Sequence, residues 1–237
     1  MQSFGQICGK CAQALPVRFK LQLRKHLDRC YERNVYILNQ IHPSDKVLDV
    51  GCVGHEIEEG DLSDPPRGYF LHHDLHQHAD QVVGLDILDT EVEKMVAAGY
   101  DVQVADAQRF DLKETFDVIV AGELIEHLEN PGLFLQCCRS HLKKDGKVII
   151  STPNPQHLQF VLYRLIGETV NDEHTLWLDH DVMETLAERE GLALTKYKYF
   201  SPNITMISMP MYKLGMAKPI TSGGYIFILE IDQETNT

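Results

Sequence analysis

The stretch Val47–His55, with the sequence VLDVGCVGH, constrains the fold of this chain more than any other. Its short apolar run is interrupted by Asp49 and ends in a turn that contains Gly51 and Gly54. Glycine tolerates a positive φ and lets another group approach the backbone closely. A helix that starts after such a turn offers free N–H groups and the positive end of its dipole to a carboxylate or phosphate. The pattern therefore predicts a buried strand, a tight turn and a helix start that can hold an anionic group.

Four further apolar segments are predicted as strands that follow this first one. They are 81–87, 101–107, 116–122 and 146–154. Helical patterns separate them, which is typical of βαβ units and of a parallel sheet with both faces covered. A last strand at 225–231 is expected to pair antiparallel with 195–200. The sequence therefore predicts a doubly wound α/β fold with a Rossmann-like, seven-stranded and mostly parallel sheet.

In the order of these motifs, the chain resembles the class I S-adenosylmethionine-dependent methyltransferases over about residues 35–200. The resemblance implies that S-adenosylmethionine is the cofactor and that the loop with Asp49, Gly51 and Gly54 holds its methionine part. Val53 departs from the family, which usually has a glycine there. We interpret residues 56–70 as an inserted loop, because the chain between the first two strands is longer than this fold usually needs.

The ends of the next three strands carry the other expected cofactor contacts. Asp86 ends the second strand, where a carboxylate can accept hydrogen bonds from both hydroxyls of a ribose. The resemblance implies that Asp106 and Ala107 lie beside the adenine. It also implies that Gly122 and Glu123, at the end of the fourth strand, lie beside the reactive sulfonium.

The segment Glu123–His127, with the sequence ELIEH, follows the fourth strand and contains the candidate catalytic residues. On a helical turn, Glu123, Glu126 and His127 would share one face. The pattern resembles the ubiquinone-pathway O-methyltransferases. It also resembles the small-RNA 2′-O-methyltransferases, in which two glutamates and two histidines hold a divalent ion. That resemblance implies a set of Glu123, Glu126, His127 and His174, whose oxygen and imidazole ligands suit magnesium, manganese or zinc.

Two mechanisms remain open at this point. A bound cation would lower the pKa of an acceptor hydroxyl, so that its alkoxide could attack the methyl group. Without a cation, His127 is the predicted general base, because imidazole titrates near neutral pH, and His174 is the second candidate. Four further histidines crowd one short predicted helix, where we expect packing or solvated roles. They are His72, His73, His76 and His78.

The first 42 residues are interpreted as a helical extension, and residues 43–237 as the methyltransferase domain. Apolar residues recur at helical spacing over 16–41, and the polar face of this segment is basic. The extension also holds Cys8, Cys11, His26 and Cys30, whose side chains are of the types that bind zinc tetrahedrally. The alternative is that the two first cysteines are reduced and the other two residues are unrelated to them.

Composition limits the classes of function. No apolar stretch reaches the about 18 residues of a membrane span, and no signal peptide is evident, so a cytoplasmic protein is expected. A net charge of −13 disfavours nucleic acid as a partner, because phosphates would be repelled. Aromatic and apolar residues of the segment 155–180 have helical spacing and are expected to pack in a core or as a lid, and the resemblance implies that this segment lies on the acceptor side of the domain. The segment 201–224 is rich in methionines, which adapt to irregular apolar shapes, so it is expected on the acceptor side as well or in a dimer contact.

We therefore predict an S-adenosylmethionine-dependent methyltransferase that modifies an oxygen of a small-molecule or glycan-like acceptor. One alternative is an RNA 2′-O-methyltransferase with a divalent metal, which the Glu/Glu/His/His set and the basic helix favour and the net charge opposes. A second alternative is a non-catalytic, cofactor-binding partner subunit. The sequence indicates neither the identity of the acceptor nor the oligomeric state.

Overall fold

The computed structural model describes residues 32–54, 70–167, 171, 173–202 and 218–233 of the chain. The chain divides into two compact units, Met1–Asp106 and Ala107–Thr237, and we describe each by itself. The predicted zinc ligands Cys8, Cys11, His26 and Cys30 lie outside the described residues, as does the segment 55–69. The zinc site therefore stays a prediction. No helix among the described residues is both long enough and apolar enough to cross a bilayer.

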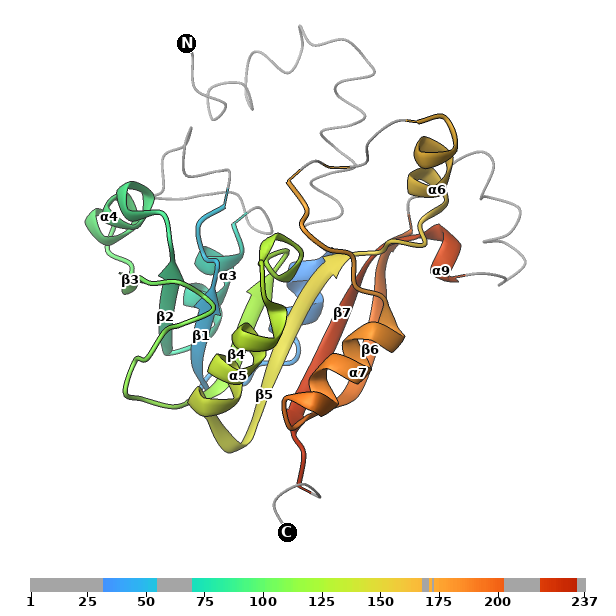
Figure 1. The fold of residues 1–237 in the computed structure, drawn as a ribbon. Helices are drawn as coiled ribbons and strands as arrows, with labels where there is room; N and C mark the ends of the chain where they lie inside the picture. The colour runs from blue at the N-terminus through green and yellow to red at the C-terminus, as the bar shows by residue number, and fades with distance from the viewer. Residues whose placement is uncertain (1–31, 55–69, 168–170, 172, 203–217, 234–237) are drawn as a thin grey trace, which may run out of the picture. The chain divides into compact units, whose positions relative to one another are not determined.

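The first unit is built on three parallel strands in the order β3-β2-β1 (Figure 1). Its elements are β1 (Lys46–Val50), α3 (Leu71–His78), β2 (Gln81–Asp86), α4 (Asp89–Ala97) and β3 (Val102–Val104). Residues 32–38, which precede β1, are also helical, in agreement with the helical pattern predicted for this region. This helix is tied to α3 by a buried hydrogen bond of 3.0 Å from the Asn34 amide to the Asp74 carboxylate.

The core of the first unit surrounds β1, whose apolar side chains are completely buried. They are Val47, Leu48 and Val50. A second cluster joins the turn after β1 to α4 and to the start of β3. It consists of Cys52, Phe70, Val92, Met95, Tyr100 and Val102. Burial of this apolar surface fixes the turn between β1 and the segment before α3, because moving the turn would expose the cluster to water.

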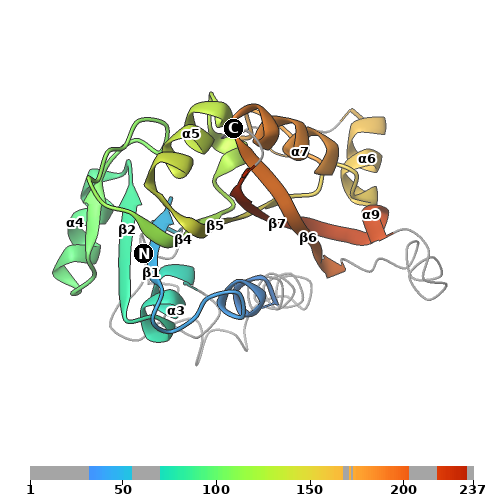
Figure 2. The same ribbon diagram turned by 90° about the horizontal axis from the view of Figure 1, so that it is seen from below.

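The second unit contains four strands in the order β4-β5-β7-β6, of which β4 and β5 are parallel and β7 is antiparallel to both of its neighbours (Figures 1 and 2). The strands are β4 (Phe116–Gly122), β5 (Leu142–Pro153), β6 (Leu192–Pro202) and β7 (Ser222–Ile231). The helical elements are η3 (Ile125–His127), α5 (Pro131–His141), α6 (Leu158–Leu165), α7 (His180–Arg189) and α9 (Lys218–Thr221). The predicted antiparallel pairing of the last strand is confirmed.

Helices α5 and α7 lie side by side on one face of this four-stranded sheet (Figures 1 and 2). Each begins at a residue whose side chain caps it: Asn130 accepts from the N–H of Leu133, and Asp179 accepts from the N–H of Val182. Such caps satisfy N–H groups that would otherwise lack partners at the first turn of a helix. The helix α6, in contrast, buries none of its residues.

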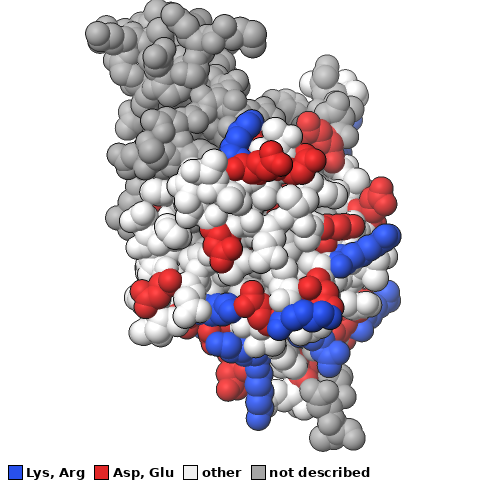
Figure 3. Space-filling model, turned by 90° about the vertical axis from the view of Figure 1, so that its left-hand side faces the viewer, with Lys and Arg blue, Asp and Glu red and all other residues white. Residues whose placement is uncertain are grey.

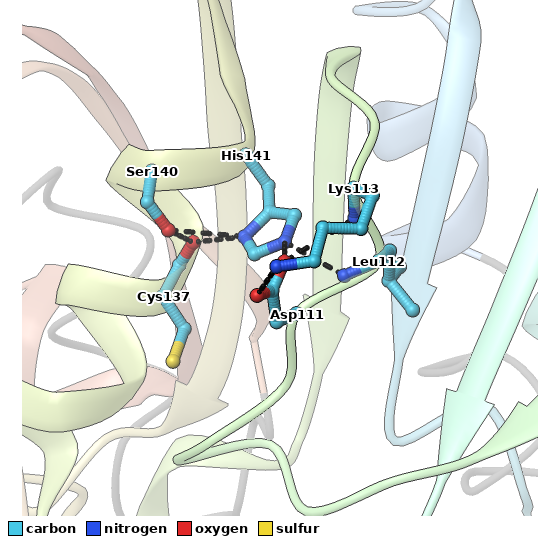
Figure 4. A network of polar contacts seen from close by, with 6 residues as sticks. All are labelled: Asp111, Leu112, Lys113, Cys137, Ser140 and His141. Atoms are coloured by element: carbon cyan, nitrogen blue, oxygen red, sulfur yellow. Dashed lines mark hydrogen bonds and ion pairs between the residues drawn. The ribbon is translucent and has the colours of Figure 1, made fainter.

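A polar network joins the C-terminal end of α5 to the loop before β4 (Figure 4). The imidazole of His141 is buried, and its Nδ1 lies 2.8 Å from the carbonyl oxygen of Cys137. Its Nε2 lies 3.0 Å from the N–H of Leu112 and can only accept there. The two contacts together require the neutral tautomer with the proton on Nδ1. His141 thereby provides the acceptor for a main-chain donor of the neighbouring loop.

The predicted doubly wound fold with seven strands, mostly parallel, is confirmed, and two details differ. The strand β5 begins at Leu142, earlier than the predicted start at residue 146, because Leu142 already pairs with Phe116. The aromatic and apolar residues of α6 were expected to pack in a core or under a lid. Leu165 and Ile166 are instead 76% and 73% exposed.

Candidate functional site

The turn after β1 is held against the end of β2 by main-chain hydrogen bonds. Gly51 has a φ of 73°, as its glycine identity predicted, and its N–H donates to the carbonyl oxygen of Leu85 at 2.8 Å. The N–H of Cys52 lies 3.3 Å from the same oxygen. A residue with a side chain at position 51 would be strained at this φ. These hydrogen bonds therefore hold the turn in one conformation before any ligand binds. Gly54, at the far end of the turn, is half-buried.

Asp86 is a second anchor of this turn. Its carboxylate accepts the N–H of Val53 at 2.9 Å and the N–H of Leu88 at 3.1 Å. Burial raises the pKa of Asp86, and hydrogen bonds from the N–H groups of Val53, Leu88 and Ile87 oppose this shift in part. The negative charge of Asp49 raises the same pKa further. The carboxylate therefore stays buried at a cost in free energy, which is typical of a functional site.

Asp49 is buried at the end of β1 and pairs with a histidine of α3. Its carboxylate oxygen lies 3.0 Å from Nδ1 of His72, and the side chain of His72 is completely buried. The ring of His72 also packs at 5.3 Å against Tyr100. Two more histidines of α3, His73 and His76, pack against the same tyrosine ring. Of the packing or solvated roles expected for these histidines, the structure shows packing for His72, His73 and His76. The contact between His72 and Asp49 had no signal in the sequence.

In the second unit, the chain leaves β4 through a strained residue. Glu123 has a φ of 56°, which residues other than glycine, asparagine and aspartate rarely adopt. Its N–H lies 3.0 Å from the carbonyl oxygen and 3.1 Å from the hydroxyl oxygen of Ser151 on β5, and these contacts hold it there. Glu123 is thus outside the helical turn η3. The expected common face with Glu126 and His127 on one helical turn is wrong, because Glu123 has a left-handed φ and lies before η3.

Glu126, His127 and His174 form the one group among the described residues whose ligand atoms could hold a metal ion, all lying within 4.8 Å of one another. Three of the four residues predicted for a cation thus come together, and Glu123 is not in the group. Burial differs among the three: Glu126 is 1% exposed, His127 is exposed and His174 is half-buried. The group is therefore anchored on one side and accessible on another.

Each member of this group has a contact that orients it. The hydroxyl of Thr152 donates to a carboxylate oxygen of Glu126 at 3.0 Å, and both residues are buried. Nδ1 of His127 lies 3.3 Å from the carbonyl oxygen of Glu173, so it carries the proton when it donates there. The rings of His127 and His174 meet edge to face at 4.9 Å. Thr152 was recognised in the sequence only as part of a strand end.

Aromatic side chains continue from His174 toward α6. The ring of Trp177 lies 5.0 Å from that of His174, and Phe160 of α6 lies 5.4 Å from Trp177. The guanidinium of Arg164 stacks over Trp177 at 5.0 Å. These contacts combine an apolar surface with one cation, and such surfaces bind planar organic molecules.

The remaining predicted cofactor residues lie near strand ends, and their contacts with a ligand stay predictions. Asp106 follows β3 and is half-buried, Ala107 is buried, and Gly122 ends β4 half-buried. The side chains of the segment 203–217 lie outside the described residues, so the predicted acceptor role of residues 201–224 is not tested there.

The matching family model and two similar relatives all indicate a methyltransferase. Residues 21–197 match the family model described as a methyltransferase domain. The chain is similar to the ubiquinone biosynthesis O-methyltransferase of Bradyrhizobium diazoefficiens, with 31% identity over 71% of this chain and 62% of the relative. It is also similar to the mitochondrial enzyme of that name from Bos taurus, with 27% identity over 63% of this chain and 41% of the relative. The chain thus spans about two fifths of the mitochondrial relatives it matches.

Solved structures share the fold. A SAM-dependent methyltransferase from Archaeoglobus fulgidus superposes with a TM-score of 0.61 at 19% identity, covering 90% of this chain and 99% of that one. Magnesium protoporphyrin IX methyltransferase from Synechocystis, with bound SAH, superposes with a TM-score of 0.58 at 13% identity, covering 86% and 83% of the two chains. At these identities the likeness concerns the fold.

Proposed function

Because the chain belongs to the methyltransferase-domain family and is an S-adenosylmethionine-dependent enzyme, we propose that it methylates a hydroxyl oxygen of a small-molecule acceptor. The observation that carries this proposal is the group of Glu126, His127 and His174, with ligand atoms within 4.8 Å of one another. A proton acceptor beside other potential cation ligands is what a hydroxyl needs in order to become a nucleophile. The relatives named O-methyltransferases support oxygen as the acceptor atom.

For the cofactor, we assign the ribose to Asp86 and the methionine part to the turn with Asp49, Gly51 and Gly54. The carboxylate of Asp86 is already oriented by two main-chain N–H groups and keeps acceptor capacity for hydroxyl donors. Bound S-adenosylmethionine supplies a methyl group activated by its sulfonium, so the carbon–sulfur bond breaks as the oxygen–carbon bond forms and one proton leaves the acceptor oxygen. The protein must therefore align the acceptor and take up that proton.

We assign proton uptake to His127. When its Nδ1–H donates to the carbonyl oxygen of Glu173, Nε2 is left with a lone pair. The exposed ring can then accept the hydroxyl proton of a docked acceptor. The edge contact with His174 fixes the ring from the other side. Trp177 and Phe160 offer an apolar surface on which a planar acceptor can rest.

The same group has the composition of a cation site. One carboxylate and two imidazoles form a set of three ligands that leaves further coordination positions open, as catalytic zinc sites do. This set favours zinc or manganese over magnesium, which takes mainly oxygen ligands. A divalent ion held there by Glu126, His127 and His174 would supply a Lewis acid that lowers the pKa of an acceptor hydroxyl.

A chelator experiment decides between the two mechanisms. With a catechol as probe acceptor and release of S-adenosylhomocysteine as readout, cation assistance predicts that EDTA abolishes turnover and that Mn²⁺ or Zn²⁺ restores it. Glu126→Gln is then about as damaging as His127→Ala. If His127 acts alone, EDTA has little effect and His127→Ala costs about 10²–10⁴-fold in rate. No loss from His127→Ala, with or without EDTA, would remove His127 from the mechanism.

The RNA alternative is disfavoured by charge. The net charge is −13, and positive and negative side chains are interspersed on the face drawn in Figure 3. Three lysines of the described residues are paired with carboxylates: Lys94 with Glu91 at 3.5 Å, Lys143 with Asp117 at 2.7 Å, and Lys113 with Asp111. Methyl transfer to a short RNA, with an affinity that falls steeply as salt rises, would instead establish an RNA substrate.

A further inference from the structure

The segment that carries His174 is attached to the turn η3 by hydrogen bonds that centre on one threonine. Residues 173–178 form no helix or strand, so no regular ladder fixes their position. The N–H of Thr175 donates to the carbonyl oxygen of Glu126 at 3.0 Å, and the N–H of Leu176 lies 3.4 Å from the same oxygen. This segment therefore takes its position from the residue that also supplies the buried carboxylate of the group.

The hydroxyl of Thr175 adds a contact that the backbone alone cannot make. Its oxygen lies 2.7 Å from the carbonyl oxygen of Leu128 and 3.0 Å from that of Glu126. The carbonyl of Glu126 already receives main-chain N–H groups, so the hydroxyl proton is directed best toward Leu128. The segment is then joined to the turn at two successive points, on either side of His127.

The consequence for the neighbouring histidine is geometric. His174 precedes Thr175 directly, and its ring meets that of His127 at 4.9 Å. On the other side of His174, the carbonyl oxygen of Glu173 lies 3.3 Å from Nδ1 of His127. A segment fixed at both of its neighbours has little freedom to carry the imidazole away from Glu126 and His127. Ligands that are held in place before an ion arrives bind it more tightly, because less conformational entropy is lost.

We infer that Thr175 is a positioning residue, whose hydroxyl holds His174 within reach of a divalent cation bound by Glu126 and His127. The inference rests on the proposed cation site and adds to it a residue that does not contact the ion. Removal of the hydroxyl should loosen the segment and displace His174, and it should also weaken the contact of His127 with Glu173, which belongs to the same segment. Glu126 keeps its contact with Thr152, so the cation should then bind with Glu126 as the one ligand whose own contact is unchanged.

The test compares Thr175→Val, which keeps the shape and removes the donor, with Thr175→Ser, which keeps the donor. Mn²⁺ binding to the full chain, without acceptor, is measured by calorimetry and by electron paramagnetic resonance. Thr175→Val should weaken Mn²⁺ binding by about 10–100-fold. Thr175→Ser should stay close to the unchanged protein. Thr185→Val is the matched control, because the Thr185 hydroxyl donates to the Asp181 carbonyl oxygen at 2.9 Å on α7.

A second measurement tests the position of His174 in metal-free protein, so its result does not depend on the proposed cation. Magnetisation transfer between ring protons of His127 and His174 is measured by NMR in metal-free protein. It should be present in the unchanged chain and in Thr175→Ser, and lost in Thr175→Val. If the unchanged protein binds neither Mn²⁺ nor Zn²⁺, the proposed cation fails, and the NMR result alone decides on Thr175. Unchanged ring contact, or unchanged Mn²⁺ affinity, in Thr175→Val would overturn the inference. If Thr175→Val does not fold, Thr175→Ala takes its place in both measurements.

Discussion

At the scale of single residues, Asp86 combines structural and functional demands on one carboxylate. It orients the turn through the N–H groups of Val53 and Leu88, and it is the assigned acceptor for the ribose hydroxyls. Burial raises its pKa, so the folded protein holds this charge against a desolvation penalty. We therefore propose that this carboxylate serves a ligand rather than stability, and both parts of this proposal can be tested.

The first prediction concerns cofactor affinity. Asp86→Ala should weaken S-adenosylhomocysteine binding by about 2–3 kcal/mol, because two ribose hydroxyls and the N–H groups of Val53 and Leu88 lose their acceptor. Titration calorimetry measures the affinity. Asp80→Ala is the control, since Asp80 is exposed just before β2 and should change the affinity by less than about 0.5 kcal/mol. Equal affinities for Asp86→Ala and the unchanged protein would refute the assigned ribose contact.

The second prediction concerns the dependence of stability on pH. The folded-state pKa of Asp86 is raised above its ordinary value, so the proton binds more tightly in the folded state than in the unfolded state. The stabilising effect of protonation is complete below the unfolded pKa and is lost as pH rises through the folded pKa. The free energy of unfolding of Asp86→Asn, minus that of the unchanged protein, should therefore increase as pH rises above about 4, the ordinary pKa of an aspartate.

Urea denaturation of the apo proteins at several pH values gives this difference. The amide that Asp86→Asn introduces can bind the N–H groups of Val53 and Leu88 less well than the carboxylate does. This loss is the same at every pH, so it shifts the difference in the free energy of unfolding by a constant and leaves its slope with pH unchanged. A flat difference across this range, or one that falls as pH rises, would contradict the raised pKa.

The sequence predicted those residues whose role follows from their position at the end of a strand. Gly51 has the predicted positive φ, and Asp86 lies at the predicted end of β2. The roles of Thr152 and Thr175 could not be predicted, because hydroxyl contacts between segments far apart in the chain leave no periodic signal in the sequence. Glu123 was expected on a helical turn, because residue spacing carries no information on the φ of a single residue, and Glu123 has a left-handed φ.

At the scale of elements, strands were predictable and the exposure of α6 was not. Parallel strands that are buried on both faces are continuous apolar runs, such as β4, and these are visible without any structure. The residues of α6 are equally apolar, yet Leu165 and Ile166 face solvent. Hydrophobic pattern alone cannot tell a helix that packs in a core from one that offers its surface to a ligand or partner.

The third prediction concerns the C-terminal end of α5. His141→Ala removes the acceptor for the N–H of Leu112 and the donor to the carbonyl oxygen of Cys137 (Figure 4). It also opens a void beside Phe110, whose ring lies 4.6 Å from the imidazole. The free energy of unfolding should fall by about 1–3 kcal/mol. Chemical denaturation measures it, with the exposed Lys144→Ala as a control that should change stability by less than about 0.5 kcal/mol.

A loss as small as that of Lys144→Ala would contradict the network drawn for His141. His141→Asn gives a further check, because its amide nitrogen can take the place of Nδ1 and donate to the carbonyl oxygen of Cys137. This variant should recover part of the lost stability, which a purely volume-related role of the ring would not allow.

At the scale of the whole molecule, the two carboxylates Asp86 and Glu126 belong to different units of the chain. Asp86, with its main-chain partners, belongs to the unit Met1–Asp106. Glu126, with Thr152, belongs to the unit Ala107–Thr237. Each carboxylate is therefore oriented by contacts that the other does not share. Removing one should leave the orientation of the other intact.

The last prediction follows from this division. Asp86→Ala should weaken S-adenosylhomocysteine binding and leave Mn²⁺ affinity unchanged, whereas Glu126→Gln should do the reverse. In the double variant each affinity should equal that of the corresponding single variant within about 0.3–0.5 kcal/mol, because effects of residues without shared partners add. Calorimetry with each ligand alone completes the cycle. Loss of S-adenosylhomocysteine binding in Glu126→Gln would instead assign this glutamate to the cofactor, and proton removal would then fall to His127 without a cation.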